Sequence, residues 1–141
     1  MFPGAADTIC GAVSHSIVQS DDLLFTERPY RPQDEPRQVV SLTETLGLGS
    51  SRASLWRYPS GARGRRHREG AQEEVFAVLE GTITLALGEP PEMVEVGAGG
   101  FVRVSTGTEI QVRNESDADA VVLAWGAPAV TGQAEILDDL P

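Results

Sequence analysis

The chain has a single cysteine, Cys10, among its 141 residues. One thiol cannot form an intramolecular disulfide or a thiolate metal cluster, which excludes a disulfide-rich secreted fold and a cysteine-bound zinc site. We expect Cys10 to be a small, at least half-buried residue. Lysine is absent, so all 11 basic residues are arginine, and against 21 acidic residues they leave a net charge of −10. Such a charge argues against a nucleic-acid partner.

Long hydrophobic runs are missing as well. No stretch approaches the ~18 apolar residues that a membrane-spanning helix needs. No Lys or Arg precedes Arg28, so the basic start of a signal peptide is also lacking. We therefore expect a cytoplasmic protein with no membrane partner.

Helical periodicity is scarce too. Apart from a modest "SLTETLG" after Val40 and the acidic tail "AEILDDLP", apolar residues do not recur at intervals of three and four. Turn signals separate short runs that are rich in β-branched and aromatic residues. These runs are "AVSHSIV", "RASLWRY", "EVFAVLE", "TITLALG", "MVEV", "FVRV", "EIQVRN" and "AVVLAW". The pattern predicts an all-β sandwich or barrel with few or no helices.

The first third of the chain is different. Its "TERPYRPQDEPRQ" stretch carries three prolines and many charges, which indicates an extended arm or loop. We predict an N-terminal arm and loop over residues 1–37, a barrel over 38–130 and an acidic tail over 131–141. His15, in "AVSHSIV", is predicted to be an ordinary strand histidine. The aromatic residues of the later strands are expected mostly in the core: Trp56, Tyr58, Phe76, Phe101 and Trp125.

The densest chemistry lies in "GARGRRHREGAQEE", residues 61–74. In an extended strand, the side chains of His67 and Glu69 lie on one face and that of Arg68 lies on the other. We expect Arg68 and Glu73 to face the solvent. Glu74 begins the next predicted strand. If the two strands form a hairpin whose common face lines a barrel, His67, Glu69 and Glu74 converge.

One imidazole and two carboxylates allow several functions. They suit a divalent Mn, Fe, Co, Ni or Zn ion, and without a metal they can bind a polar molecule. General acid–base catalysis by His67 with Glu74 as its partner is a further alternative. The same residues can also form a structural polar network or exposed turn carboxylates. Arg63 and Arg65 have the parity to reach a pocket mouth and hold a carboxylate or phosphate, although solvated loop arginines are commoner.

The spacing of these residues resembles the first motif of the cupin superfamily. That motif is a glycine, five residues, His-x-His, three or four residues, Glu, six residues and a glycine. This chain has Gly61, five residues, His67-x-Glu69, four residues, Glu74, six residues and Gly81. Every spacing holds, with a glutamate in place of the second histidine.

A second cupin motif runs glycine, five residues, Pro-x-Gly, two residues, His, three residues, Asn. Here it reads Gly99, five residues, Ser105-x-Gly107, two residues, Ile110, three residues, Asn114. The glycines and the asparagine are kept, whereas the proline and the histidine are not. The resemblance implies a cupin-type jelly-roll barrel, commonly a homodimer, with one internal pocket.

The resemblance further implies that a metal-binding cupin takes three His and one Glu from these positions. Since isoleucine cannot coordinate, Ile110 removes one ligand and leaves His67, Glu69 and Glu74 as candidate ligands of a weakly held divalent ion. The predicted pocket consists of His67, Glu69, Glu74, Phe76, Ile110, Asn114 and Arg65. We predict a barrel that binds a small polar or carbohydrate-like molecule, without a tightly bound metal. The alternatives are a metal-dependent dioxygenase or sugar isomerase/epimerase, and a structural or regulatory protein with a vestigial pocket.

Overall fold

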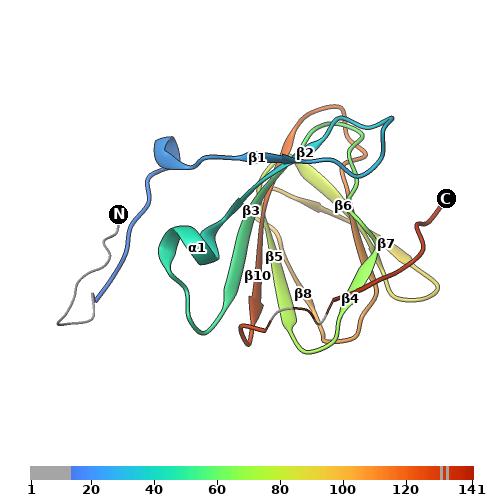
Figure 1. Ribbon diagram of the computed structural model, residues 1–141. Coiled ribbons are helices and arrows are strands. Elements are labelled where there is room, and N and C mark those ends of the chain that lie inside the picture. The colour runs from blue at the N-terminus through green and yellow to red at the C-terminus, as the bar shows by residue number, and fades with distance from the viewer. Residues whose placement is uncertain (1–13, 131, 133) are drawn as a thin grey trace.

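The structure, a computed structural model, describes residues 14–130, 132 and 134–141, so Cys10 lies outside the described residues. It is nearly all β and consists of two antiparallel sheets that face each other (Figure 1). The predicted all-β double-sheet architecture is thereby confirmed. No described helix is long and apolar enough to cross a membrane.

The two sheets divide the strands in a non-sequential order. The six-stranded sheet contains, from edge to edge, β1 (Thr26–Arg28), β2 (Arg37–Ser41), β3 (Arg52–Tyr58), β10 (Ala120–Ala127), β5 (Glu73–Glu80) and β8 (Phe101–Val104). The five-stranded sheet contains β11 (Ala134–Ile136), β4 (His67–Glu69), β9 (Ile110–Arg113), β6 (Thr82–Leu87) and β7 (Glu92–Gly97). Crossovers between the sheets therefore build the jelly roll.

Two short helical segments accompany the strands. η1 (Ser20–Asp22) is a single 3-10 turn, and α1 (Leu42–Leu46) lies in "SLTETLG", the stretch with modest helical periodicity. The Ser41 side chain accepts a hydrogen bond from the Glu44 backbone N–H, which satisfies a free donor of the first turn. Gly47 ends the helix in the left-handed conformation, with φ 73°.

Of the eight runs that are predicted to be strands, seven form strands, and the first, "AVSHSIV", does not. The described residues of "AVSHSIV", 14–18, are irregular, and His15 is exposed beside the Ser14 hydroxyl, so it is not a strand histidine. The helical periodicity of the tail is also misleading, because residues 134–136 form β11. This strand pairs with β4 through Ala134 opposite Glu69 and Ile136 opposite His67. An unpaired strand edge binds any extended segment that reaches it, which outweighs a weak helical pattern.

The predicted hairpin between β4 and β5 is wrong. β4 pairs with β9 and β11 in one sheet, whereas β5 pairs with β8 and β10 in the other. Residues 70–72 therefore cross from one sheet to the facing one. His67 and Glu69 project into the interior from one layer, and Glu74 projects from the opposite layer.

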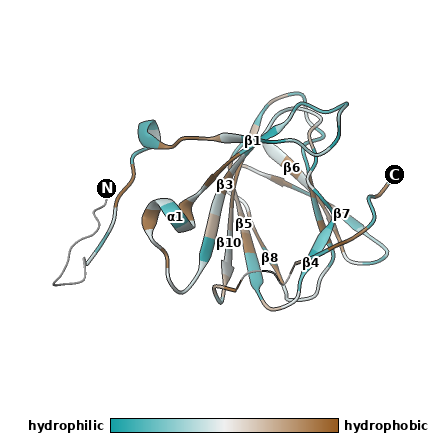
Figure 2. Cartoon of the chain, viewed as in Figure 1, coloured by the Kyte–Doolittle hydropathy of each residue, from teal (hydrophilic) through white to brown (hydrophobic). Residues whose placement is uncertain are grey.

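The core lies between the sheets and is mostly aliphatic. Its most deeply buried side chains include Val78, Ile83, Leu85, Ile110 and Val122, each at most 1% exposed. Both hydrophobic and hydrophilic residues occur along the strands, as expected when alternate side chains face the core and the outside (Figure 2). Tyr58 and Phe76 are buried as predicted.

Two of the aromatic residues do not belong to the core. Phe101 is 73% exposed and Trp125 is 45% exposed. Their strand partners are Ala77 and Val75, which alternate with the inward-facing Phe76 on β5. Phe101 and Trp125 therefore lie on the outer face of the six-stranded sheet, where strand composition alone does not distinguish the two faces.

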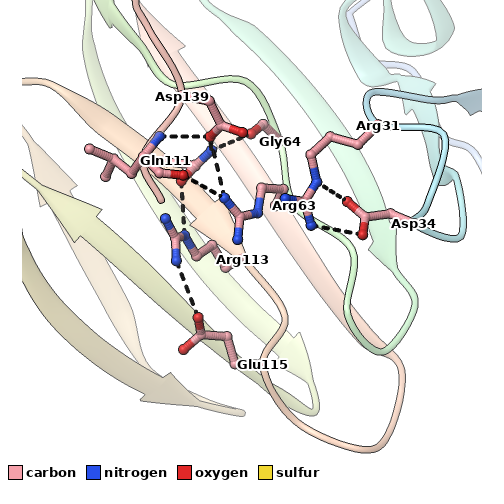
Figure 3. A network of polar contacts seen from close by, with 9 residues as sticks. Arg31, Asp34, Arg63, Gly64, Gln111, Arg113, Glu115 and Asp139 are labelled. Atoms are coloured by element: carbon pink, nitrogen blue, oxygen red, sulfur yellow. Dashed lines mark hydrogen bonds and ion pairs between the residues drawn. The ribbon is translucent and has the colours of Figure 1, made fainter.

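The C-terminal segment is tied to the barrel by polar contacts. Asp139 Oδ1 accepts hydrogen bonds from Gln111 Nε2 at 2.6 Å and Arg63 Nη1 at 3.4 Å, and the Leu140 carbonyl accepts from Arg63 Nη1 at 3.0 Å (Figure 3). Burial would raise the pKa of Asp139, but the hydrogen bonds from Gln111 and the Leu140 N–H and the charge of Arg63 outweigh it and lower this pKa. The division into arm, barrel and tail remains a prediction, although β1 and β11 are integral strands of the two sheets.

Candidate functional site

A cavity of about 350 Å³ opens between the two sheets. The six-stranded sheet contributes aromatic and charged side chains from β2, β3 and β5, and the five-stranded sheet contributes β4 and β11. Lining residues include Arg37, Trp56, Tyr58, His67, Glu69, Glu74, Phe76 and Ile136. A volume of this size lies at the small end of the range for ligand sites, roughly 300–1,000 Å³.

His67, Glu69 and Glu74 meet in this cavity. His67 Nε2 lies 3.5 Å from Glu69 Oε2 and 4.0 Å from Glu74 Oε1. One ligand atom from each side chain lies within 4.8 Å of the others, and all three residues are half-buried. Although the predicted hairpin is absent, the predicted convergence occurs because the two sheets face each other.

The backbone orients the imidazole. His67 Nδ1 lies 3.2 Å from the carbonyl oxygen of Arg65. A carbonyl oxygen only accepts, so Nδ1 carries the hydrogen and Nε2 faces the carboxylates. In the neutral ring, the Nε2 lone pair is therefore available to a proton, a ligand or a metal.

The two central groups influence each other's protonation. Burial raises the pKa of Glu74, although the charge of His67 opposes the rise. For His67, burial alone would lower the pKa. The hydrogen bond to Glu69, the Arg65 carbonyl and the charges of Glu74 and Glu69 together outweigh burial and raise the pKa of the imidazole. A histidine and a glutamate that both have a raised pKa lie side by side in the cavity, an arrangement that suits proton transfer as well as binding.

One oxygen of the cluster is unsatisfied. Among the described residues, Glu74 Oε1 is buried without a hydrogen-bond partner, and the only other such side-chain atom is Arg37 Nε. Buried polar atoms without a partner are uncommon in native proteins and call for an explanation such as a bound ion or ligand.

Five of the seven predicted pocket residues line the cavity, and two do not. His67, Glu69, Glu74, Phe76 and Arg65 are lining residues. Ile110 is instead fully buried in the hydrophobic core, directly opposite His67 on the neighbouring strand. Asn114 is 1% exposed and holds the turn after β9, with its Nδ2 donating to the carbonyl oxygens of Tyr58 and Ala118.

Of the charged residues next to the cluster in the sequence, some lie outside the cavity and one lines it. Glu73 and Arg68 lie outside the cavity, Glu73 3.8 Å from Arg103 and Arg68 bound to Glu135 and Glu109. Arg63 does not line the cavity, because its guanidinium binds the C-terminal segment. Only Arg65, exposed and stacked 5.1 Å from the Tyr30 ring centroid, reaches the predicted position.

Several lining residues are not predicted from the sequence, and four of them carry charged or amide side chains. These are Arg28, Arg37, Arg52 and Gln72. The prolines before Arg37 place it at the end of the predicted arm, yet it is the first residue of β2. Its alternation with the buried Val39 was the available signal. Gln72 donates to the carbonyl oxygens of Pro128 and Val130 and so fixes the loop that follows β10.

The His67, Glu69 and Glu74 donor set fits a divalent metal ion. One imidazole nitrogen and two carboxylate oxygens converge, and one of those oxygens has no other partner. Three ligands on one side leave the remaining coordination positions to water or a bound molecule. The high oxygen content favours Mn²⁺ or Fe²⁺ over metals that prefer sulfur and nitrogen ligands.

Comparison with known proteins supports the fold. The model of the cupin domain matches residues 54–126, whereas no curated protein matches the chain in sequence. A sugar phosphate isomerase of the cupin superfamily from Silicibacter pomeroyi superposes with a TM-score of 0.74 at 23% identity, covering 88% of this chain and 83% of that one.

Two further structures share the fold. The polyketide cyclase RemF from Streptomyces resistomycificus has a TM-score of 0.73 at 18% identity, covering 89% of this chain and 87% of its own. A predicted oxalate decarboxylase from Thermotoga maritima has a TM-score of 0.70 at 16% identity, covering 80% and 99%. Such identities establish the architecture and leave the chemistry open. With the domain model matching more than half of its length, the chain belongs to the cupin family.

Proposed function

We propose that this cupin binds a small polar molecule in the cavity between its sheets, with His67, Glu69 and Glu74 as the polar contacts. The observation that carries this proposal is the buried Glu74 Oε1, which lies 4.0 Å from His67 Nε2 and has no hydrogen-bond partner among the described residues. A hydroxyl group of a ligand would donate to this oxygen. Trp56 and Phe76 provide the apolar surface that such sites combine with a few placed polar groups.

Substitutions of two adjacent glutamates, Glu74 and Glu73, test this proposal. Glu74→Gln should lower the affinity for a stabilising hit from a panel of sugars and organic acids by about tenfold, equivalent to about 1.4 kcal/mol. The change preserves shape and removes the acceptor charge at the unsatisfied oxygen. Thermal shifts at several ligand concentrations give the affinity.

Glu73→Gln is the matched control. Glu73 precedes Glu74 but lies on the outer face, exposed beside Arg103, so its change should leave the affinity unaltered. Equal effects of the two substitutions would contradict a site at Glu74. If no sugar or acid in the panel stabilises the protein, the vestigial-pocket alternative is supported instead.

A metal-dependent enzyme is the second candidate. The mutual distances of at most 4.8 Å between the three ligand atoms favour it. A bound divalent ion would act as a Lewis acid, polarising an oxygen of the bound molecule. His67 would supply the imidazole ligand, and Glu69 and Glu74 would supply the carboxylates. The Arg65 carbonyl already holds the ring with Nε2 directed inward.

The two histidines of the chain separate these candidates. Protein is purified without an affinity tag or chelator, and elemental analysis gives its metal content. Titration with Mn²⁺ should then show measurable binding, and His67→Ala should lower the affinity for Mn²⁺ at least tenfold, about 1.4 kcal/mol. His15→Ala is the control, because His15 is exposed in an irregular segment outside the cavity. Equal Mn²⁺ binding by wild type and His67→Ala would contradict the metal site, and the metal-free binding proposal would stand.

A further inference from the structure

The cavity has a cationic part that the proposed polar contacts do not use. Among the described residues, four arginines line it, Arg28, Arg37, Arg52 and Arg65, against two carboxylates, Glu69 and Glu74. Burial raises the pKa of Glu74, and the charge of Arg52 is one of the influences that oppose this rise. The excess of positive charge therefore belongs to the other three arginines, in a chain whose net charge is −10.

Arg37 is the central member of this group. It is 8% exposed, and its Nε has no hydrogen-bond partner among the described residues. Its one side-chain hydrogen bond in the described part of the chain is a long one of 3.5 Å from Nη1 to Tyr58 Oη. Tyr58 does not serve as a counter-ion, because burial raises the pKa of its hydroxyl despite the opposing charge of Arg37. Burying an unpaired charge is costly, so this arrangement requires an explanation.

Aromatic rings hold the guanidinium groups in place. The Arg37 Cζ lies 4.7 Å from the Trp56 ring centroid and 5.7 Å from that of Tyr58, and the Arg28 Cζ lies 5.8 Å from Trp56. Cation–π contacts orient these groups without neutralising them. Two cations that share one indole repel each other, and a bound anion would relieve this repulsion.

Other arginines of the chain show the contrast. Arg31 pairs with Asp34, Arg63 with Asp139 and Arg113 with Glu115 (Figure 3). No ion pair within 4.0 Å forms at Arg28, Arg37 or Arg65 among the described residues. Of the seven described arginines outside the cavity, all except Arg57 have a carboxylate within 4.0 Å, whereas none of the four that line the cavity has one.

Gly64 further limits the position of Arg37. A Cβ atom at residue 64 would lie 3.0 Å from Arg37 Nη1 and 2.9 Å from Tyr58 Oη. The backbone therefore packs closely against the guanidinium and the phenol. Arg37 is held in a fixed place at the cavity wall, as expected for a group that recognises an acid group through paired N–H donors.

We propose that Arg37, with Arg28 and Arg65 of the same cavity lining, binds the acid group of a small carboxylate or phosphate ligand whose hydroxyl end contacts His67, Glu69 and Glu74. This inference rests on the proposed function, since it names the class of molecule that the same cavity takes. A guanidinium binds either acid through paired N–H donors.

Two matched pairs of probes test the acid group. Glycerol 3-phosphate is compared with glycerol, and threonate with threitol, by calorimetry and thermal shift. In each pair only one member carries an acid. We expect at least one acid to bind ten times more tightly than its neutral partner, a difference of about 1.4 kcal/mol. The pair with the larger difference identifies phosphate or carboxylate as the preferred group.

Arg37→Met should remove that preference and leave the affinity for the neutral member unchanged. Arg103→Met is the control, because Arg103 lies on the outer face with its side chain 67% exposed. Loss of cation–π contacts in Arg37→Met is offset by removal of an unpaired buried charge, so the variant should remain folded. Should it not fold, Arg28→Met tests the same group from an exposed residue and should reduce the preference at least threefold.

The outcomes separate this inference from the proposed function. Equal affinity within both pairs, including no detectable binding, or an acid preference that survives Arg37→Met, overturns the anion subsite. The proposed function stands in that case if Glu74→Gln still weakens binding of threitol or glycerol. Loss of the preference in Arg37→Met, together with unchanged affinities in Glu74→Gln, supports the anion subsite and contradicts the proposed polar contacts.

Discussion

Ile110→His should raise the affinity for Mn²⁺ at least tenfold, by about 1.4 kcal/mol or more. Ile110 on β9 lies directly opposite His67 on β4, and side chains of such pairs share a face with Cβ atoms roughly 4.5–5.5 Å apart. A new imidazole there would join His67, Glu69 and Glu74 as a fourth ligand. Calorimetric titration with Mn²⁺ measures the change.

The same substitution should destabilise the metal-free protein. Ile110 is fully buried in the core, and replacing its apolar side chain by an imidazole costs about 2 kcal/mol. The melting temperature should therefore fall without metal and recover when Mn²⁺ is added. Ile110→Asn is the control for the loss of core packing, because an amide at this position lowers stability without adding an imidazole. Unchanged Mn²⁺ affinity in Ile110→His would show that position 110 does not reach the cluster.

Asn114→Ala should lower the free energy of unfolding by about 3 kcal/mol. Asn114 Nδ2 donates to the carbonyl oxygens of Tyr58 at 2.8 Å and Ala118 at 2.7 Å, while Oδ1 accepts from the Ser116 N–H at 3.0 Å. These bonds fasten the turn after β9 to the end of β3. Truncation leaves the two carbonyl oxygens without this donor, at a site that is 1% exposed. Urea unfolding followed by tryptophan fluorescence gives the difference.

Ser116→Ala provides the comparison for that loss. The Ser116 hydroxyl donates to Asn114 Oδ1 at 2.6 Å, but the residue is only half-buried, so water replaces the lost contact. Its removal should cost about 1 kcal/mol or less. A similarly small effect of Asn114→Ala would refute its structural role.

The strands were predictable because their side chains alternate. Runs such as "RASLWRY" and "FVRV" coincide with β3 and β8, and the period of two is set by the pleated backbone. Pairing between strands was harder to predict. The short connection 70–72 between β4 and β5 indicates a hairpin, yet the chain crosses between sheets there, since each strand pairs with distant partners. Such pairing depends on which edges remain free, and local sequence does not encode this.

The candidate site was partly predictable for a similar reason. Spacing brought His67, Glu69 and Glu74 together correctly, but it could not show that Ile110 lies in the core or that Asn114 holds a turn. Arg37 was hidden by the proline-rich segment before it, although β2 begins at this residue. Its importance arises from its surroundings, the rings of Trp56 and Tyr58, which only the folded chain provides. Homodimer formation and cytoplasmic location remain predictions.

The three residues of the cluster come from facing layers, with His67 and Glu69 on β4 and Glu74 on β5. A molecule bound among them would act as an additional crosslink between the two layers. Unfolding requires the two sheets to separate. Separation would break the contacts between the bound molecule and the sheets before water could replace them. Occupancy would therefore slow unfolding itself, and a protease that cleaves only the opened chain would degrade the occupied protein more slowly.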